Sequence, residues 1–180
     1  MNTSILLLIL ALIGIASYVL GTRRAVAMVG ASTTKMHSRP GYHGSYVLVW
    51  AVLPAAFILA LWLIVSPLVI TSAVRASFPE DIQAQSEAQQ SLNYGMVGSI
   101  ARGLERLTPE EFAAAKADPA TLRPLLGSKG VAIAGDPQPY MVEAAETLNT
   151  MSATSQIGMV LVVLVAAIGG ALYAMRGIAP

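Results

Sequence analysis

The chain has 180 residues, of which 55% are hydrophobic and only 12% are charged, and its formal net charge is +1. Soluble domains carry about 25% charged residues, so a composition this poor in charge favours a membrane protein. The sequence contains no cysteine, which excludes disulfides, cysteine-based metal sites and thiol chemistry. Its histidines, His37 and His43, precede every carboxylate, so a zinc or di-iron site is hard to assemble and no metal or cofactor is expected.

The first apolar run, residues 5–20, predicts a transmembrane helix within residues 1–22. With its flanking residues the run is just long enough to cross a hydrocarbon core of about 30 Å. A cleaved signal peptide is the alternative, but it requires positive charge before the apolar run. Here no Lys or Arg precedes the run, and Arg23-Arg24 follows it. The order of charges therefore predicts an uncleaved helix whose N-terminus faces outward.

A short basic loop is expected at residues 23–45, where Arg23, Arg24, Lys35 and Arg39 occur without an acidic residue. The positive-inside rule assigns such a loop to the cytoplasm. Contact with anionic lipid head groups is the simplest role for these charges, and phosphate binding is the alternative.

A second transmembrane helix is predicted at residues 46–70, which carry no charged side chain and can cross the bilayer with some tilt. Tyr46 and Trp50 lie near its cytoplasmic start, where aromatic rings favour the membrane interface. Trp62 lies deeper in the run, so we expect it to pack against another helix. Pro54 removes a backbone donor and is expected to kink the helix.

Residues 71–155 form a polar segment that contains all ten acidic residues of the chain. Six basic residues accompany them, which leaves the segment with a net charge of −4. The contrast with the basic loop predicts an extracytoplasmic segment. Nothing in the sequence selects two of these carboxylates as an acid–base pair, which would need a convergent pocket, so no catalysis is expected.

The polar segment is predicted to be helical. One face of the first helix is marked by apolar residues at spacings of four, four, four and three: Leu92, Met96, Ile100, Leu104 and Leu107. Thr108, Pro109 and Glu111 then have the pattern of a capping box at the start of a short helix that ends near Lys116. A loop is expected at residues 127–139, followed by a helix at residues 140–151.

A third transmembrane helix is predicted at residues 156–180, with Arg176 at its cytoplasmic end. Ala166 and Gly170 form a pair of small residues four apart, which permits close approach of a second helix. The expected fold is thus an all-α membrane protein with three transmembrane helices. A small helical extracytoplasmic segment separates the second and third helices, and the C-terminus faces the cytoplasm.

The polar turn before the second helix carries a resemblance to a known family. It resembles the N-terminal membrane region of the PstC-type permease of bacterial phosphate importers, in which a His-Ser-x-Pro-x-Tyr-x-Gly-type turn leads into a helix. The residues that carry the resemblance are His37, Ser38, Arg39, Pro40, Tyr42, Gly44, Tyr46, Trp50 and Pro54. The remainder of the chain matches the family mainly in its layout.

The resemblance implies a non-catalytic accessory region in the bacterial inner membrane. Its partners would be the lipid bilayer, a permease core and an ATPase subunit, and no nucleic acid is expected. In the family, a translocation core with a coupling loop follows the third helix, and this sequence ends at Pro180. We therefore expect the core to be absent from this chain, and the family's phosphate-binding and coupling residues have no counterpart here. The alternative is a small accessory or assembly subunit of another bacterial membrane complex, for example a respiratory or photosynthetic one.

Overall fold

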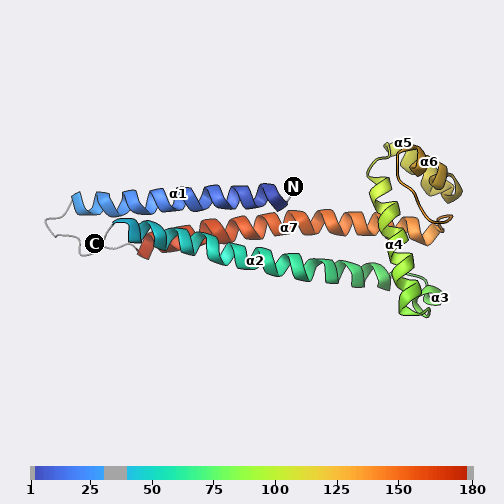
Figure 1. The fold of residues 1–180 in the computed structure, drawn as a ribbon, viewed down its shortest axis with the longest axis horizontal. Helices are drawn as coiled ribbons and strands as arrows, with labels where there is room; N and C mark the ends of the chain where they lie inside the picture. The colour runs from blue at the N-terminus through green and yellow to red at the C-terminus, as the bar shows by residue number, and fades with distance from the viewer. Residues whose placement is uncertain (1–2, 31–39, 178–180) are drawn as a thin grey trace. The chain divides into compact units, whose positions relative to one another are not determined.

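The computed structural model describes residues 3–30 and 40–177, and every regular element among them is a helix (Figure 1). Three of these helices are long and apolar enough to cross a membrane: α1 (Thr3–Gly30), α2 (Pro40–Ala76) and α7 (Pro139–Gly177). The all-α class and the three candidate membrane helices predicted from the sequence are thereby confirmed.

The chain divides into two compact units. The first, here called the membrane unit, consists of Met1–Val65 and Ser155–Pro180. The second, here called the middle unit, consists of Ser66–Thr154. Because α2 and α7 are continuous helices, each contributes residues to both units.

Each helix of the membrane unit buries a narrow stripe of residues three or four positions apart, as expected for helices that pack along their length. In α1 the stripe comprises Leu6, Leu10, Gly14, Ser17, Gly21 and Ala25. In α2 it comprises Gly44, Val47, Ala51, Ala55 and Leu59, and in α7 it comprises Met159, Val163, Ala167, Ala171 and Ala174. Glycine and alanine occupy much of all three stripes, and small residues allow helix backbones to approach closely in a membrane.

The middle unit contains four short α-helices and one 3₁₀ turn between the ends of α2 and α7. The helices are α3 (Glu80–Gln83), α4 (Glu87–Leu104), α5 (Pro109–Ala117) and α6 (Leu122–Ser128), and the 3₁₀ turn is η1 (Pro119–Thr121). Their apolar side chains form one cluster around Val97, Ile100, Leu122 and Leu126, all fully buried. A hydrophobic cluster of this kind is the main source of stability for so small a unit.

Side-chain caps set where two of these helices begin. Ser86 caps α4 by accepting a hydrogen bond from the backbone N–H of Gln89. Thr108 caps α5 by accepting from the backbone N–H of Glu111, whose carboxylate in turn accepts from the backbone N–H of Thr108 at 2.9 Å. The predicted capping box is therefore confirmed.

Three details of the sequence-based description were wrong. Pro40 begins α2, so the part of the expected turn from Pro40 to Tyr46 is helical. The helix expected at residues 140–151 and the third membrane helix are one continuous helix, α7. Leu92, expected on the buried face of α4, is 74% exposed. The buried residues of the face are instead Val97, Ile100, Ala101 and Leu104, and Tyr94 and Met96 pack against them while partly buried.

Candidate functional site

Two glycines, Gly21 and Gly44, lie where the backbones of α1 and α2 approach each other closely. A β-carbon placed on Gly21 would lie 3.0 Å from the carbonyl oxygen of His43 and 3.2 Å from the Cα of Gly44. One placed on Gly44 would lie 2.8 Å from the carbonyl oxygen of Tyr18. Real β-carbons do not approach backbone atoms this closely, so only glycine fits at Gly44 without a shift of one helix.

A third glycine brings α7 against α2. A β-carbon on Gly170 would clash with the carbonyl oxygen of Trp50, and it would lie 2.9 Å from the carbonyl carbon of that residue. The Cα of Ala51 would be 3.4 Å away. The neighbouring Gly169 has no atom within 4 Å of its β-carbon position. The two adjacent glycines therefore differ completely in their surroundings, and only Gly170 faces a helix of this chain.

Nearer the other end of the membrane unit, α2 and α7 are joined by a polar contact. The indole Nε1 of Trp62 donates a hydrogen bond of 3.0 Å to the Oγ of Ser155. The β-carbon position of Gly158, one turn further along α7, lies 3.3 Å from the same indole ring. Trp62 thus packs against another helix, as its depth in the apolar run predicted.

An aromatic group lies on α2 and α7 beside the Gly170 contact. The rings of Tyr46 and Trp50 have centroids 6.3 Å apart, and those of Trp50 and Tyr173 are 5.1 Å apart. All three side chains are at least 40% exposed. Amphipathic rings of this kind favour the boundary between lipid and water.

Outside the buried stripes, the membrane unit exposes large apolar side chains on all three helices. The most exposed of them include Leu8, Leu12, Ile15, Leu53, Phe57, Ile64, Leu161, Val165 and Leu172. Soluble monomers rarely expose contiguous apolar surface of more than a few hundred Å². This surface is therefore suited to lipid chains or to the helices of another membrane protein.

The residues singled out in the sequence fall into three groups. His37, Ser38 and Arg39 lie outside the described residues. Pro40, Tyr42, Gly44, Tyr46, Trp50 and Pro54 all lie in α2, where Gly44 is buried and Tyr42 is exposed. Ala166 and Gly170 lie in α7, both partly buried. The structure brings Gly170 and Trp50 together, while it brings Gly44 against α1.

Sequence reasoning missed the glycines of α1. Gly14 and Gly21 are seven residues apart, and Ser17 and Ala25 continue the same face at spacings of three and four. This run of small residues was the available signal, because it has the spacing of a helix-packing stripe. In the structure, a β-carbon on Gly14 would lie 2.9 Å from a methyl carbon of Val52 in α2.

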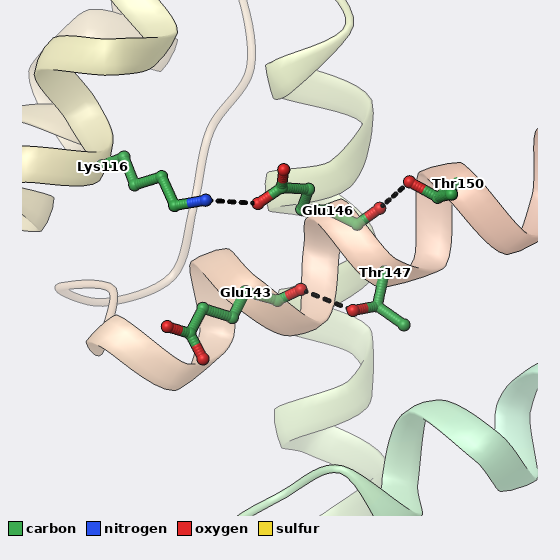
Figure 2. Close-up of polar contacts among 5 residues, drawn as sticks. All are labelled: Lys116, Glu143, Glu146, Thr147 and Thr150. Atoms are coloured by element: carbon green, nitrogen blue, oxygen red, sulfur yellow. Dashed lines mark hydrogen bonds and ion pairs between the residues drawn. The ribbon is translucent and has the colours of Figure 1, made fainter.

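In the middle unit, Lys116 on α5 and Glu146 on α7 form an ion pair, with Nζ and Oε2 2.9 Å apart (Figure 2). The hydrogen bond that Lys116 donates to the carboxylate of Glu146 raises the pKa of Lys116 above its ordinary value. Figure 2 also shows Thr147 and Thr150 donating to the backbone carbonyls of Glu143 and Glu146 within α7. Because Lys116 and Glu146 are both substantially exposed, the pair positions α5 but adds little stability.

A second ion pair joins Glu111 to Lys129, with Oε1 and Nζ 3.0 Å apart. The pKa of Glu111 is lowered, chiefly by the hydrogen bond from the Thr108 backbone and then by Lys129. These charged groups hold neighbouring segments of the middle unit together. Among residues 3–30 and 40–177, no group of three His, Cys, Asp or Glu side chains is placed to hold a metal ion.

Comparison with known proteins identifies a family that the chain matches. A family model described as phosphate ATP-binding cassette transporter matches residues 7–172. The chain belongs to this family. The match covers most of α1 and α7, all of α2 and the whole middle unit, in agreement with the resemblance to the N-terminal region of a phosphate transporter permease. No curated protein and no solved structure matches this member of the phosphate transporter family.

Proposed function

We propose that the chain is a non-catalytic accessory region of a phosphate ATP-binding cassette importer that packs against a transport core in the membrane. The observation that carries this proposal is the family match, which extends through residues 7–172. The resemblance to the N-terminal region of a phosphate importer permease implies that ATP hydrolysis would belong to a partner subunit.

The distribution of exposed side chains supports packing against a partner. The three buried stripes join α1, α2 and α7 to one another, and the opposite faces remain open. Phe57 on α2 and Val165 on α7 are 67% and 70% exposed. Helix association in a membrane depends on close packing of such faces, so these positions are candidates for contact with the helices of a core.

The proposed topology follows the charges. Residues 1–22, 46–70 and 156–180 would cross the bacterial inner membrane, with the N-terminus in the periplasm. Residues 23–45 would form the cytoplasmic loop, and residues 71–155 would be periplasmic. The basic loop and the acidic middle segment differ in charge as the positive-inside rule expects.

Site-specific photo-crosslinking tests this function. A photoreactive residue at Phe57 or Val165 should capture the permease core in native membranes, and mass spectrometry should recover the ATPase subunit with it. Matched probes at Ala55 and Ala167, both 0% exposed, should give only crosslinks within the chain. Stable capture of respiratory or photosynthetic subunits at the exposed positions would overturn the proposal in favour of another membrane complex.

A further inference from the structure

The membrane unit has one end that is strongly basic. Arg23 and Arg24 on α1 and Arg176 on α7 are all exposed. The unit contains no acidic residue, since every Asp and Glu of the chain lies between Glu80 and Glu146. The positive charge of these arginines is therefore not neutralised within the unit.

Contacts between the helices place the three arginines at nearly the same position along the helix axes. Gly21 lies against Gly44 at the start of α2, and Arg23 and Arg24 follow Gly21 within one helical turn. Arg176 precedes Gly177, whose β-carbon position is 3.8 Å from the hydroxyl oxygen of Tyr46. Gly170 lies against the backbone of Trp50. Arg176 follows Gly170 by six residues, and Gly44 precedes Trp50 by six residues in the antiparallel helix. All three arginines therefore lie within about one turn, or about 5 Å, of Gly44 along the helix axes. Figure 1 shows the start of α2 and the last turn of α7 at this same end of the unit.

Exposed aromatic side chains adjoin the arginines. Tyr42, Tyr46 and Tyr173 are 72%, 43% and 62% exposed, and Trp50 lies between the last two. Beyond them the exposed side chains of the spans are mainly apolar. On α7 the exposed side chains follow the order Arg176, then Tyr173, then the aliphatic Leu172 and Ile168, which matches the order of head group, interface and acyl chain in a bilayer leaflet.

We propose that this end of the membrane unit binds anionic phospholipid through Arg23, Arg24 and Arg176, with the neighbouring aromatic rings against the upper acyl chains. Guanidinium groups pair well with phosphate oxygens because their donors form a planar fork. Inorganic phosphate offers the same oxygens, but it would leave the aromatic rings and the apolar surface beside them without a ligand. A phospholipid occupies both parts of the surface, and for this reason the site is assigned to lipid.

Native mass spectrometry of the delipidated chain in detergent tests the proposal. Phosphatidylglycerol and phosphatidylcholine are added in turn, and the bound lipids are counted. We expect phosphatidylglycerol to bind at least about tenfold more tightly. Each arginine near an anionic surface contributes roughly a fivefold change in affinity, so replacing Arg23, Arg24 and Arg176 together by Gln should weaken binding on the order of 100-fold.

The matched control removes the same charge from the middle unit. Replacing Arg102, Arg106 and Arg123 by Gln should leave phosphatidylglycerol binding unchanged, and circular dichroism should show equal helicity in both triple variants. A variant with Lys at positions 23, 24 and 176 should retain most of the binding, which separates loss of charge from loss of fold. Equal binding by the Gln variant and the wild type would overturn the proposal. Displacement of the lipid by millimolar inorganic phosphate would also overturn it and would indicate a site for soluble anions.

Discussion

Gly170 of α7 lies directly against the backbone carbonyl of Trp50 in α2, and a β-carbon at position 170 would clash with that carbonyl oxygen. The contact joins the last span to the second one at a point where both helices present backbone to each other. Gly170 belongs to the pair with Ala166 that the sequence singled out for helix packing. Its neighbour Gly169 is exposed, and a β-carbon at that position would have no other residue's atom within 4 Å. The pair provides an internal comparison for the effect of a side chain at this point.

Substitution of Gly170 should loosen the membrane unit, whereas substitution of Gly169 should not. Gly170→Ala forces the helices apart, and overpacking of this kind costs about 1–3 kcal/mol. Gly170→Leu should be more severe and should weaken assembly on native gels. Gly169→Ala removes a glycine from an open helix position and should be neutral or slightly stabilising. Thermal unfolding in detergent measures all three, and equal stability of Gly170→Leu and the wild type would contradict the contact.

A side chain added at the contact between Gly21 of α1 and Gly44 of α2 should destabilise the membrane unit in the same way. Gly44→Ala places a methyl group 2.8 Å from the carbonyl oxygen of Tyr18, so α1 and α2 must separate. Gly41→Ala is the matched control, because its β-carbon would be 3.5 Å from the Tyr18 hydroxyl, an ordinary contact. Gly44→Ala should lower the unfolding temperature in detergent and Gly41→Ala should leave it nearly unchanged. If both variants behave alike, the contact does not depend on the absence of a side chain at Gly44.

These glycines also show how far the sequence could predict the fold. The three apolar runs identified the membrane helices, since uninterrupted hydrophobicity over a bilayer's thickness is a local property. The capping box at Thr108 was equally readable, because its hydrogen bonds join residues three apart. Helix packing at Gly170 was suggested by the small-residue spacing, although its partner, the backbone of Trp50, depends on tertiary structure.

The errors arose where tertiary contacts decide the outcome. Gly41 and Gly44 predicted a turn because glycine costs about 1 kcal/mol in a helix. Pro40 nevertheless fits the first helical position. The close packing of Gly44 on α1 compensates for the low helix propensity of glycine. Likewise, separate helices were expected at residues 140–151 and 156–180, but residues 152–155 between them contain neither Gly nor Pro, and α7 continues through them.

The Trp62–Ser155 hydrogen bond should have a small but measurable coupling energy. Interhelical hydrogen bonds in membranes contribute about 0.6 kcal/mol on average. A double-mutant cycle with Trp62→Phe, Ser155→Ala and the combined variant separates this term from the loss of indole packing. We expect the second substitution to cost less once the first has been made. Strictly additive effects on the free energy of unfolding would show that the bond does not stabilise the contact between α2 and α7.

The stability of α5 should depend on pH through Glu111. The pKa of this carboxyl is lowered from its ordinary value of 4.5, so the folded state favours the charged form. Its contribution is therefore fully present above pH 4.5 and is lost as the pH falls through the lowered pKa. Hydrogen exchange of α5 amides, corrected for intrinsic rates, should show more frequent opening in acid. Glu111→Gln should remove much of the pH dependence of α5 opening. Glu110→Gln, which changes the exposed neighbouring residue, should leave that pH dependence in place.

The proposed topology can be tested against a clean background, because the chain contains no cysteine. Single cysteines are introduced at Lys35, Arg39, Glu110 and Arg176, all polar positions at which a small side chain should be tolerated. In intact cells a membrane-impermeant maleimide should label position 110 alone, since the acidic middle segment is proposed to face the periplasm and the basic positions the cytoplasm. After permeabilisation all four positions should react, which verifies that the unlabelled cysteines are accessible. Labelling of position 39 but not of position 110 in intact cells would invert the topology. It would also place the arginine-rich end of the membrane unit in the outer leaflet.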